Sequence, residues 1–392
     1  MKRYGERIFV YLSKFSGYFT SVVLLLIVLV FFKEAFNLFR TPIIDDTSVL
    51  IVHSSNPIRT LDSKQINAIF SNEIDSWDEL GGDELEIIKL NYDKLGFEDS
   101  SAGSSVALKN KVVDLVRNCK GVILIMPKAL LPYELKSNVL QLTTYDLMSC
   151  LSGTIWDPTL FPSAQYGFWP LILGTLLLAL LSVCIAMPLS LIVGLYISAI
   201  SSPNQKLLVV SFIELIATIP SVVYGFVGLV VVVPFLQFYF EPSAVITGVT
   251  AILILAFMIL PTLILSTYKA IDSVSYSFKE GAYALGVSEW QMLIKVILPA
   301  SFVGILSGSL MGLVRAIGET MIVLVLVGNA KIMPVKLIQS VPNIHSSIAL
   351  ELNHVLVGSS HYYALFALGA VLLVLSIVIT IVVEMLNRKS YS

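Results

Sequence analysis

Residues Lys279 to Ser301 read KEGAYALGVSEWQMLIKVILPAS and interrupt the apolar sequence that surrounds them. Four of these residues are charged, whereas the neighbouring runs 244–268 and 301–328 are almost entirely apolar. Each run is longer than the roughly 20 residues that a helix needs to cross a bilayer. We therefore interpret residues 269–300 as a polar loop between two membrane spans.

Four further apolar runs of similar length indicate a membrane protein. They lie at 16–39, 169–199, 207–237 and 362–386. The whole chain of 392 residues is 56% hydrophobic and only 13% charged, with a mean hydropathy of +0.85. Soluble domains average about 25% charged residues. The sequence thus predicts a polytopic α-helical membrane protein with six transmembrane helices, the first retained as an anchor because no small-residue cleavage motif follows it.

The charges at the chain ends predict the orientation. Lys2 and Arg3 precede the first span, and Arg388 and Lys389 follow the last. Basic residues favour the cytoplasmic side of a membrane, and six spans place both ends on one side. We expect both termini and the 269–300 loop to be cytoplasmic, in a multi-pass protein of the bacterial inner membrane.

The long segment between the first two spans is predicted to be an extracytoplasmic domain. Thr41 to Cys150 contains 16 acidic and 10 basic residues, whereas the rest of the chain contains 11 and 15. Its strands are expected at 49–53, 85–90 and 122–126, with a capped helix at 60–70. These elements predict a small α/β domain.

This organisation divides the chain into three parts. Residues 1–40 form the N-terminal arm and first span, 41–168 the α/β domain, and 169–392 a membrane core of five helices with its loop. Cys119 and Cys150 lie in the α/β part, and the sequence leaves a disulfide and two free thiols equally open.

Charged and helix-breaking residues inside the spans are the candidate functional residues. Arg315 and Glu319 are four positions apart, so we expect them on one helix face, one turn apart and directed into the bundle. They could form a structural ion pair or handle an anion, because arginine offers a planar fork of donors. Glu214 has the same two interpretations. Pro220 predicts a kink, and Tyr224 and Gly225 fit either a gate or close helix packing.

Catalytic signatures are missing from the sequence. It contains no GxxxxGK[ST] phosphate loop, no metal-ligand cluster and no nucleophile elbow. We expect no catalytic residue, no metal site, no directly bound cofactor and no nucleic-acid partner. Any ATP and Mg²⁺ would belong to separate subunits.

The 269–300 loop resembles the "EAA" signature of ABC importer permeases. Glu280-Gly281-Ala282, then Gly286 and finally Leu298-Pro299 have the spacing of that signature, with Gly281 and Val296 in place of alanine and isoleucine. The resemblance implies a type I ABC importer permease fold and a short coupling helix that docks on an ATPase subunit. We expect Gly286 to permit a sharp turn and Pro299 to end the second segment of the loop. The apolar contact surface would comprise Ala282, Tyr283, Leu285 and Val287.

Two further blocks resemble permeases of phosphate ABC importers. Residues 315–320, RAIGET, are similar to the R-A-x-G-E-T motif of that family, and residues 214–225, ELIATIPSVVYG, are similar to a second motif. The resemblance, which favours the C-type subunit, implies a substrate path with Arg315, Glu319, Thr320 and Glu214. The implied partners are an A-type permease subunit, two ATPase subunits, an extracytoplasmic phosphate-binding protein and membrane lipid.

Two alternatives remain at this point. The chain could be a permease for another oxyanion, such as molybdate or sulfate, or a transporter-derived membrane sensor or scaffold. The α/β domain favours the sensor, because residues 61–82 resemble part of phosphate-binding proteins while the stretch after Leu90 lacks their arginine and Ser-Gly-Thr anion loop. We interpret this domain as one lobe that has lost phosphate binding.

Overall fold

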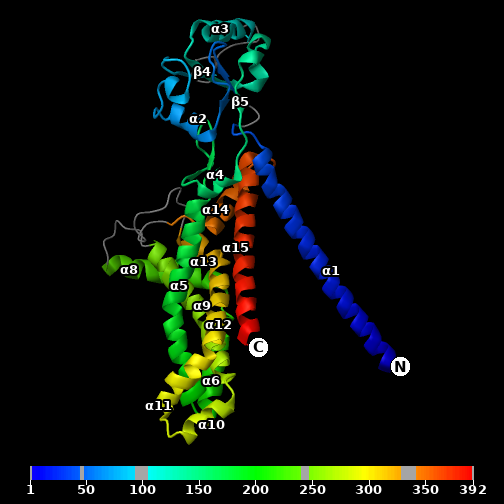
Figure 1. Cartoon of the computed structure of the whole chain (residues 1–392), viewed down its shortest axis with the longest axis vertical. Helices are drawn as coiled ribbons and strands as arrows, with labels where there is room; N and C mark the ends of the chain where they lie inside the picture. The colour runs from blue at the N-terminus through cyan, green and yellow to red at the C-terminus, as the bar shows by residue number, and fades with distance from the viewer. Residues whose placement is uncertain (1, 45–47, 93–104, 240–246, 328–340, 391–392) are drawn as a thin grey trace. The chain divides into compact units, whose positions relative to one another are not determined.

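The computed structural model describes residues 2–44, 48–92, 105–239, 247–327 and 341–390. Within them, six helical stretches are long and apolar enough to cross a membrane: Tyr11–Arg40, Trp169–Ile200, Ser221–Tyr239, Gly248–Asp272, Glu289–Ile317 and Ser360–Leu386 (Figure 1). The predicted six spans are confirmed. The third and fifth differ in position from the predicted 207–237 and 301–328.

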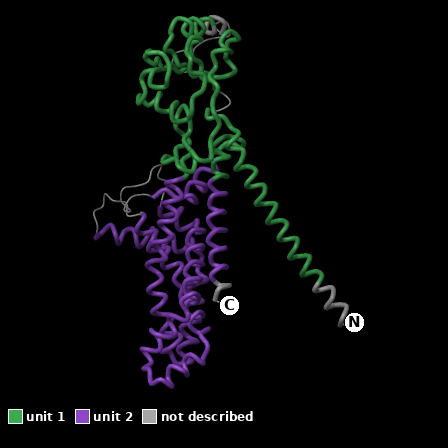
Figure 2. The backbone as a smooth tube through the Cα atoms, in the orientation of Figure 1, with its two compact units in different colours: residues 1–168, 355–367 green, residues 169–354, 368–392 purple. Residues whose placement is uncertain are grey.

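The chain forms two compact units (Figure 2). Unit 1 comprises Met1–Phe168 and Val355–Ala367, and unit 2 comprises Trp169–His354 and Leu368–Ser392. Unit 2 therefore contains the helices of the membrane core, whereas unit 1 contains the first span and the α/β domain.

Unit 2 is built around three long helices that pack closely. These are α5 (Trp169–Leu195, continued by the π-helical η6, Tyr196–Ile200), α9 (Thr247–Asp272) and α12 (Leu298–Ile317). Gly304, Gly308 and Gly312 recur every four residues along α12, where an added Cβ would lie 2.7–2.8 Å from atoms of α9. Small residues at this spacing let membrane helices approach closely. The apolar cluster at these contacts is the core of the unit.

The third span is broken rather than kinked. Helix α6 (Pro203–Ala217) stops before Pro220, and α7 (Ser221–Val227), the π-helical η7 (Gly228–Val232) and α8 (Val233–Tyr239) follow. Pro220 precedes α7 as its N-cap, because proline lacks the N–H that a continuous helix requires and disfavours helical geometry in the residue before it. The remaining helices are α10 (Tyr276–Ala284), α11 (Glu289–Met292), η8 (Leu293–Ile297), α13 (Met321–Leu326), α14 (Ile344–Glu351), η9 (Leu352–His354) and α15 (Ser360–Ser390).

The α/β domain of unit 1 has a three-stranded sheet in the order β1-β4-β3. β1 (Ser48–Val52) is antiparallel and β3 (Ile88–Asn91) parallel to the central β4 (Val122–Pro127). Alternate side chains of the sheet pack on α2 (Ser63–Phe70) and on α3 (Ser105–Asn118), which cover its two faces. The predicted α/β character is confirmed, although the predicted helix 60–70 begins at Ser63, capped by Asp62.

The first span lies on the long helix α1 (Lys2–Asn37) and on η1 (Leu38–Arg40). Short elements complete unit 1: β2 (Thr60–Leu61), η2 (Asp78–Leu80), η4 (Lys128–Leu130), η5 (Tyr133–Asn138), β5 (Gln141–Leu142), α4 (Leu147–Ser152), β6 (Trp156–Asp157) and β7 (Gln165–Tyr166). The Tyr166 hydroxyl lies 3.0 Å from Ser360 Oγ, so the first turn of α15 packs on the β6–β7 hairpin. Cys119 and Cys150 are both free thiols, and burial raises the pKa of Cys150 to about 12.

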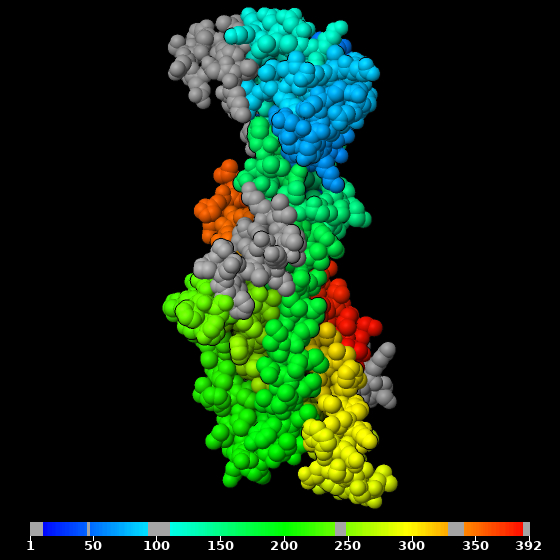
Figure 3. Space-filling view, turned by 90° about the vertical axis from the view of Figure 1, so that its left-hand side faces the viewer, coloured from blue at the N-terminus to red at the C-terminus, as the bar shows by residue number. Residues whose placement is uncertain are grey.

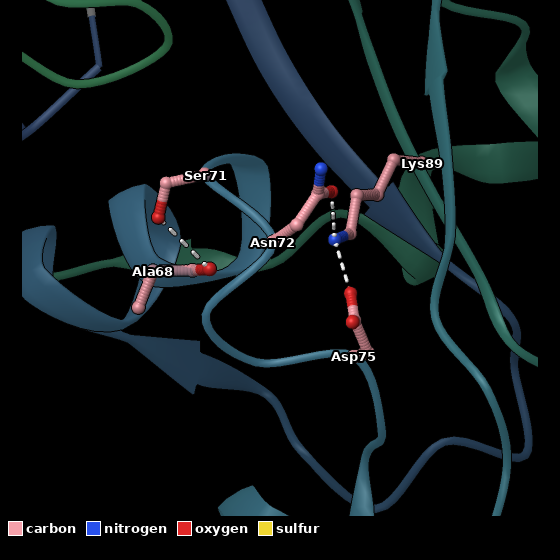
Figure 4. Close-up of polar contacts among 5 residues, drawn as sticks. All are labelled: Ala68, Ser71, Asn72, Asp75 and Lys89. Atoms are coloured by element: carbon pink, nitrogen blue, oxygen red, sulfur yellow. Dashed lines mark hydrogen bonds and ion pairs between the residues drawn. The ribbon is translucent and has the colours of Figure 1, made fainter.

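The turn after α2 is held by a polar contact with β3. Asn72 in this turn adopts a left-handed φ of 63°. Its Oδ1 accepts a hydrogen bond from Lys89 Nζ at 2.7 Å, and the same ammonium binds Asp75 at 2.7 Å (Figure 4). Asparagine tolerates this conformation better than most residues, and here it also contributes a cross-link to β3.

Replacing Asn72 by alanine is expected to lower the free energy of unfolding of the α/β domain by about 1–2 kcal/mol, because alanine is strained at positive φ and loses the Lys89 hydrogen bond. Glycine removes the strain and loses only the bond, so Asn72→Gly should be close to neutral. Urea unfolding of residues 41–168, followed by tryptophan fluorescence, measures both. Equal destabilisation by glycine and alanine would contradict the role of φ.

Candidate functional site

Residues 276–300 form a helical hairpin at one end of unit 2 (Figures 1 and 3). Helix α10 ends at Ala284, and Gly286 follows with φ of 72°, a left-handed conformation that glycine adopts without strain. Ser288 then caps α11, with its side chain accepting from Gln291 N. The predicted sharp turn at Gly286 is confirmed.

The predicted contact surface of this hairpin is only half correct. Ala282 is buried and Val287 packs beside it against Ile271 and Met292, so both hold the hairpin together. Tyr283 and Leu285, in contrast, are 51% and 83% exposed. Trp290, Phe278 and Tyr276 are exposed as well. The free apolar surface is therefore aromatic and includes residues that the motif did not indicate.

Pro299 does not end the second segment, contrary to prediction. α11, the π-helical η8 and α12 follow one another without an intervening loop, so that the span runs from Glu289 to Ile317 with Leu298 and Pro299 inside it. The π-helical turn changes the hydrogen-bond register just before the proline, and the first turn of α12 accepts a residue without N–H. Glu280 and Gly281 are exposed on α10.

Arg315 and Glu319 do not share a helix face, which corrects a central prediction. Helix α12 ends at Ile317 with Gly318 as its C-cap, and Glu319 lies beyond it. Glu319 Oε1 instead accepts from Met321 N at 3.0 Å and from Ile322 N at 3.4 Å, at the start of α13. Carboxylates are stabilised there because the N–H groups of a first helical turn are unpaired. Among the described residues, no ion pair joins Glu319 to Arg315.

Arg315 is exposed on the surface of this chain rather than directed into its own bundle. Its Nη1 donates to Thr262 Oγ1 of α9. Among the side-chain hydrogen bonds of the described residues this neutral hydroxyl is its partner, and a guanidinium has further donors that can bind an anion. Thr262 was missed from the sequence; it directly follows Pro261, which lies inside α9.

The other predicted path residues lie apart from this arrangement. Thr320 is the N-cap of α13 and has no side-chain capping bond, and Glu214 is exposed on α6. Neither contacts Arg315 in any interaction between described residues that the structure resolves. Their roles in a path remain predictions.

The predicted gate residues surround the break in the third span. The Tyr224 hydroxyl donates to the Ile216 carbonyl at 3.3 Å, which links α7 back to α6 across Pro220. Gly225 is buried, and an added Cβ would lie 3.5 Å from Ile322 Cα, so α7 packs directly on α13. The close approach predicted for Gly225 is confirmed. The break in the third span precedes α7 and Glu319 precedes α13, so both lie next to the contact between these two short helices.

Within the described part of the chain, no group of three or more His, Cys, Asp or Glu side chains could hold a metal ion. The candidate site consists of the Arg315 guanidinium, its neutral partner Thr262 and the two helix breaks that follow α6 and α12.

Comparisons with known proteins agree on one class of membrane protein. The family described as "Binding-protein-dependent transport system inner membrane component" matches residues 186–390. A probable ABC transporter permease of Bacillus subtilis, YqgH, is 33% identical over 61% of this chain and 77% of its own length. The phosphate transport system permease protein PstC of Haemophilus influenzae is 34% identical over 62% of this chain and 81% of its own.

Alignment with a solved structure gives only low similarity. A phosphate ABC transporter substrate-binding protein from Clostridium perfringens, with bound phosphate, aligns with 26% of this chain and 45% of its own. The identity is 22% and the TM-score 0.18. At that score the alignment adds nothing to the assignment of this chain, which depends on the sequence relatives.

Proposed function

The chain belongs to the family of binding-protein-dependent transport system inner membrane components, and on that premise we propose that it is the permease subunit of an ATP-driven importer of inorganic phosphate. The observation that carries the substrate assignment is Arg315. Arg315 lies in the last turn of α12, at the end of a membrane span. Among the side-chain hydrogen bonds of the described residues, its guanidinium has one partner, Thr262. A planar fork of donors matches the oxygen geometry of phosphate.

Similarity to several phosphate permeases supports the same substrate. Relatives named phosphate transport system permease protein PstC match 58–62% of the chain at 28–34% identity. These relatives do not favour the molybdate or sulfate alternative, nor a sensor that transports nothing. The chain is accordingly a transport subunit, and ATP hydrolysis belongs to separate ATPase subunits.

The mechanism that fits this geometry is alternating access. ATP binding closes a dimer of partner ATPases, which push on the exposed aromatic surface of the 276–300 hairpin. Because η8 and α12 continue that hairpin without an intervening loop, the push reaches Arg315 along one continuous helical path. The break at Pro220 lets α7 move with α13 while α6 stays in place. Arg315 then stabilises phosphate transiently, weakly enough for release.

The partners and orientation are part of the proposal. We infer a second, A-type permease subunit that completes the path beside Arg315, because that side chain is exposed on this chain. A phosphate-binding protein would deliver the substrate on the outer side. Both termini and the coupling hairpin would be cytoplasmic, as the charge distribution predicts.

Radiolabelled phosphate uptake tests this function. The host lacks its own phosphate importers and expresses the chain with its neighbouring transporter genes. We expect ATP-dependent uptake that excess molybdate or sulfate does not reduce. Uptake that either competitor abolishes would shift the assignment to another oxyanion, and no uptake of any oxyanion by an intact complex would favour the sensor.

The α/β domain is proposed to bind no phosphate. Its expected anion loop falls mostly in residues 93–104, outside the described residues. The cavity of about 750 Å³ in unit 1 is lined by Glu73 and Asp157 but by a single cation, Lys64. Titration of folded residues 41–168 with phosphate should therefore release no heat. Binding at micromolar concentration would mean that the domain is a functional receptor.

A further inference from the structure

The break in the third span leaves an apolar cavity of about 420 Å³ between α6, α7, η7 and α9. Ten of its eleven lining residues have hydrocarbon side chains, among them Ile213, Leu253 and Phe257. The exception is Tyr224, whose hydroxyl is already bonded to the Ile216 carbonyl. The cavity therefore offers a ligand no unsatisfied polar group.

Such a cavity does not hold water, because a buried water needs two to four polar partners. It is also open to the surroundings of the chain, since Phe257 and Val227 at its edge are 57% and 42% exposed. α7, η7, α8 and α9 belong to two stretches that are long and apolar enough to span a membrane, so the opening lies at the depth of the hydrocarbon core. A lipid acyl chain at that depth matches the apolar lining of the cavity.

A basic group lies where the head of such a lipid would be. Lys206 is on α6, seven residues before Ile213, which is about 10 Å along a helix. It lies 3.3 Å from Asp272 and over the ring of Tyr268, both on α9, the second helix of the cavity. Its side chain is 32% exposed, and Lys269 on the same helix is exposed. Half the thickness of the hydrocarbon core, about 15 Å, is enough to reach the cavity from there.

We propose that this cavity binds one acyl chain of an anionic phospholipid, with the phosphate of its headgroup at Lys206 and Lys269. The tail fills the space created where α6 ends and α7 begins, beside Pro261. Thr262, the partner of Arg315, is the next residue. The bound acyl chain therefore sets how closely the broken third span approaches α9, near the Arg315 guanidinium.

The full transporter complex, in nanodiscs of phosphatidylcholine with a minority of phosphatidylglycerol, tests the site. Native mass spectrometry after mild delipidation should detect one retained phosphatidylglycerol per chain. Leu253→Trp fills the cavity and should lose it, whereas Leu208→Trp, at an α6 position that is 71% exposed, should retain it. Equal retention in all three proteins would refute the site.

Charge variants separate the headgroup contact from the structural ion pair. Lys206→Gln should reduce retention about tenfold, and Asp272→Asn should leave it unchanged or increase it. If both variants reduced retention equally, the ion pair and not the lipid would be the cause.

A photo-reactive benzophenone side chain introduced in place of Phe257 tests the site without requiring that a variant fill the cavity. Cross-linking to phospholipid supports the proposal, and cross-linking to the second permease subunit would overturn it. None of these measurements depends on phosphate transport. A failure of the lipid site can therefore be told apart from a failure of the proposed function.

Discussion

Phosphate uptake should fall about a hundredfold when Arg315 is replaced by alanine. A charge-assisted hydrogen bond to phosphate contributes roughly 3 kcal/mol at most, which corresponds to about two factors of ten. Arg315→Lys keeps the charge and loses the fork, so it should retain intermediate activity. Initial rates of radiolabelled uptake by membranes with equal amounts of assembled complex measure the effect.

The neighbours of Arg315 provide the matched controls. Thr262→Val removes the hydroxyl that holds the guanidinium and changes little else, so uptake should fall only severalfold, mainly through a weaker apparent affinity. If Arg315→Ala left uptake untouched while Glu280→Ala abolished it, Arg315 would have a structural role.

The second large effect is expected at the exposed end of the coupling hairpin. Leu285 is 83% exposed, so Leu285→Asp should leave the fold of unit 2 unchanged while placing a charge on the apolar surface that we propose as the docking surface. We expect loss of both ATPase co-purification and phosphate uptake.

Leu356→Asp is the control for this change, because Leu356 is 80% exposed and belongs to unit 1, whereas the hairpin belongs to unit 2. It should keep both activities. Normal ATPase binding by Leu285→Asp would show that the aromatic surface of α10 and α11 is not the docking surface.

The sequence predicted the elements better than their ends. Six spans, the α/β domain and the turn at Gly286 follow from apolar length, alternation and a glycine in a polar loop. The sequence does not predict that Arg315 and Glu319 are separated by a helix end. The apolar run continues through Gly318, and a periodicity of 3.6 residues cannot reveal a gap inside it. The pattern Gly318-Glu319-Thr320 nevertheless combines a helix stop with residues that favour a helix start, and could have indicated the break.

The inward direction of Ala282 and the aromatic docking surface depend on tertiary packing. A short loop helix presents only two or three turns, so its sequence does not show which face meets Ile271 and Met292. Thr262 was missed for a similar reason. A threonine in a membrane span usually bonds its own backbone, and its contact with Arg315 arises from how α9 and α12 pack.

Hydrogen bonds join the start and the end of the long segment that forms the α/β domain. Ile43 N donates to the Thr143 carbonyl at 3.2 Å, and the Tyr145 hydroxyl donates to the Ile43 carbonyl at 3.1 Å. A segment whose two ends meet can be added or removed without stretching the chain on either side. This junction is therefore a natural splice point, where recombination or protein engineering can exchange one module for another without altering the sequence of the membrane core.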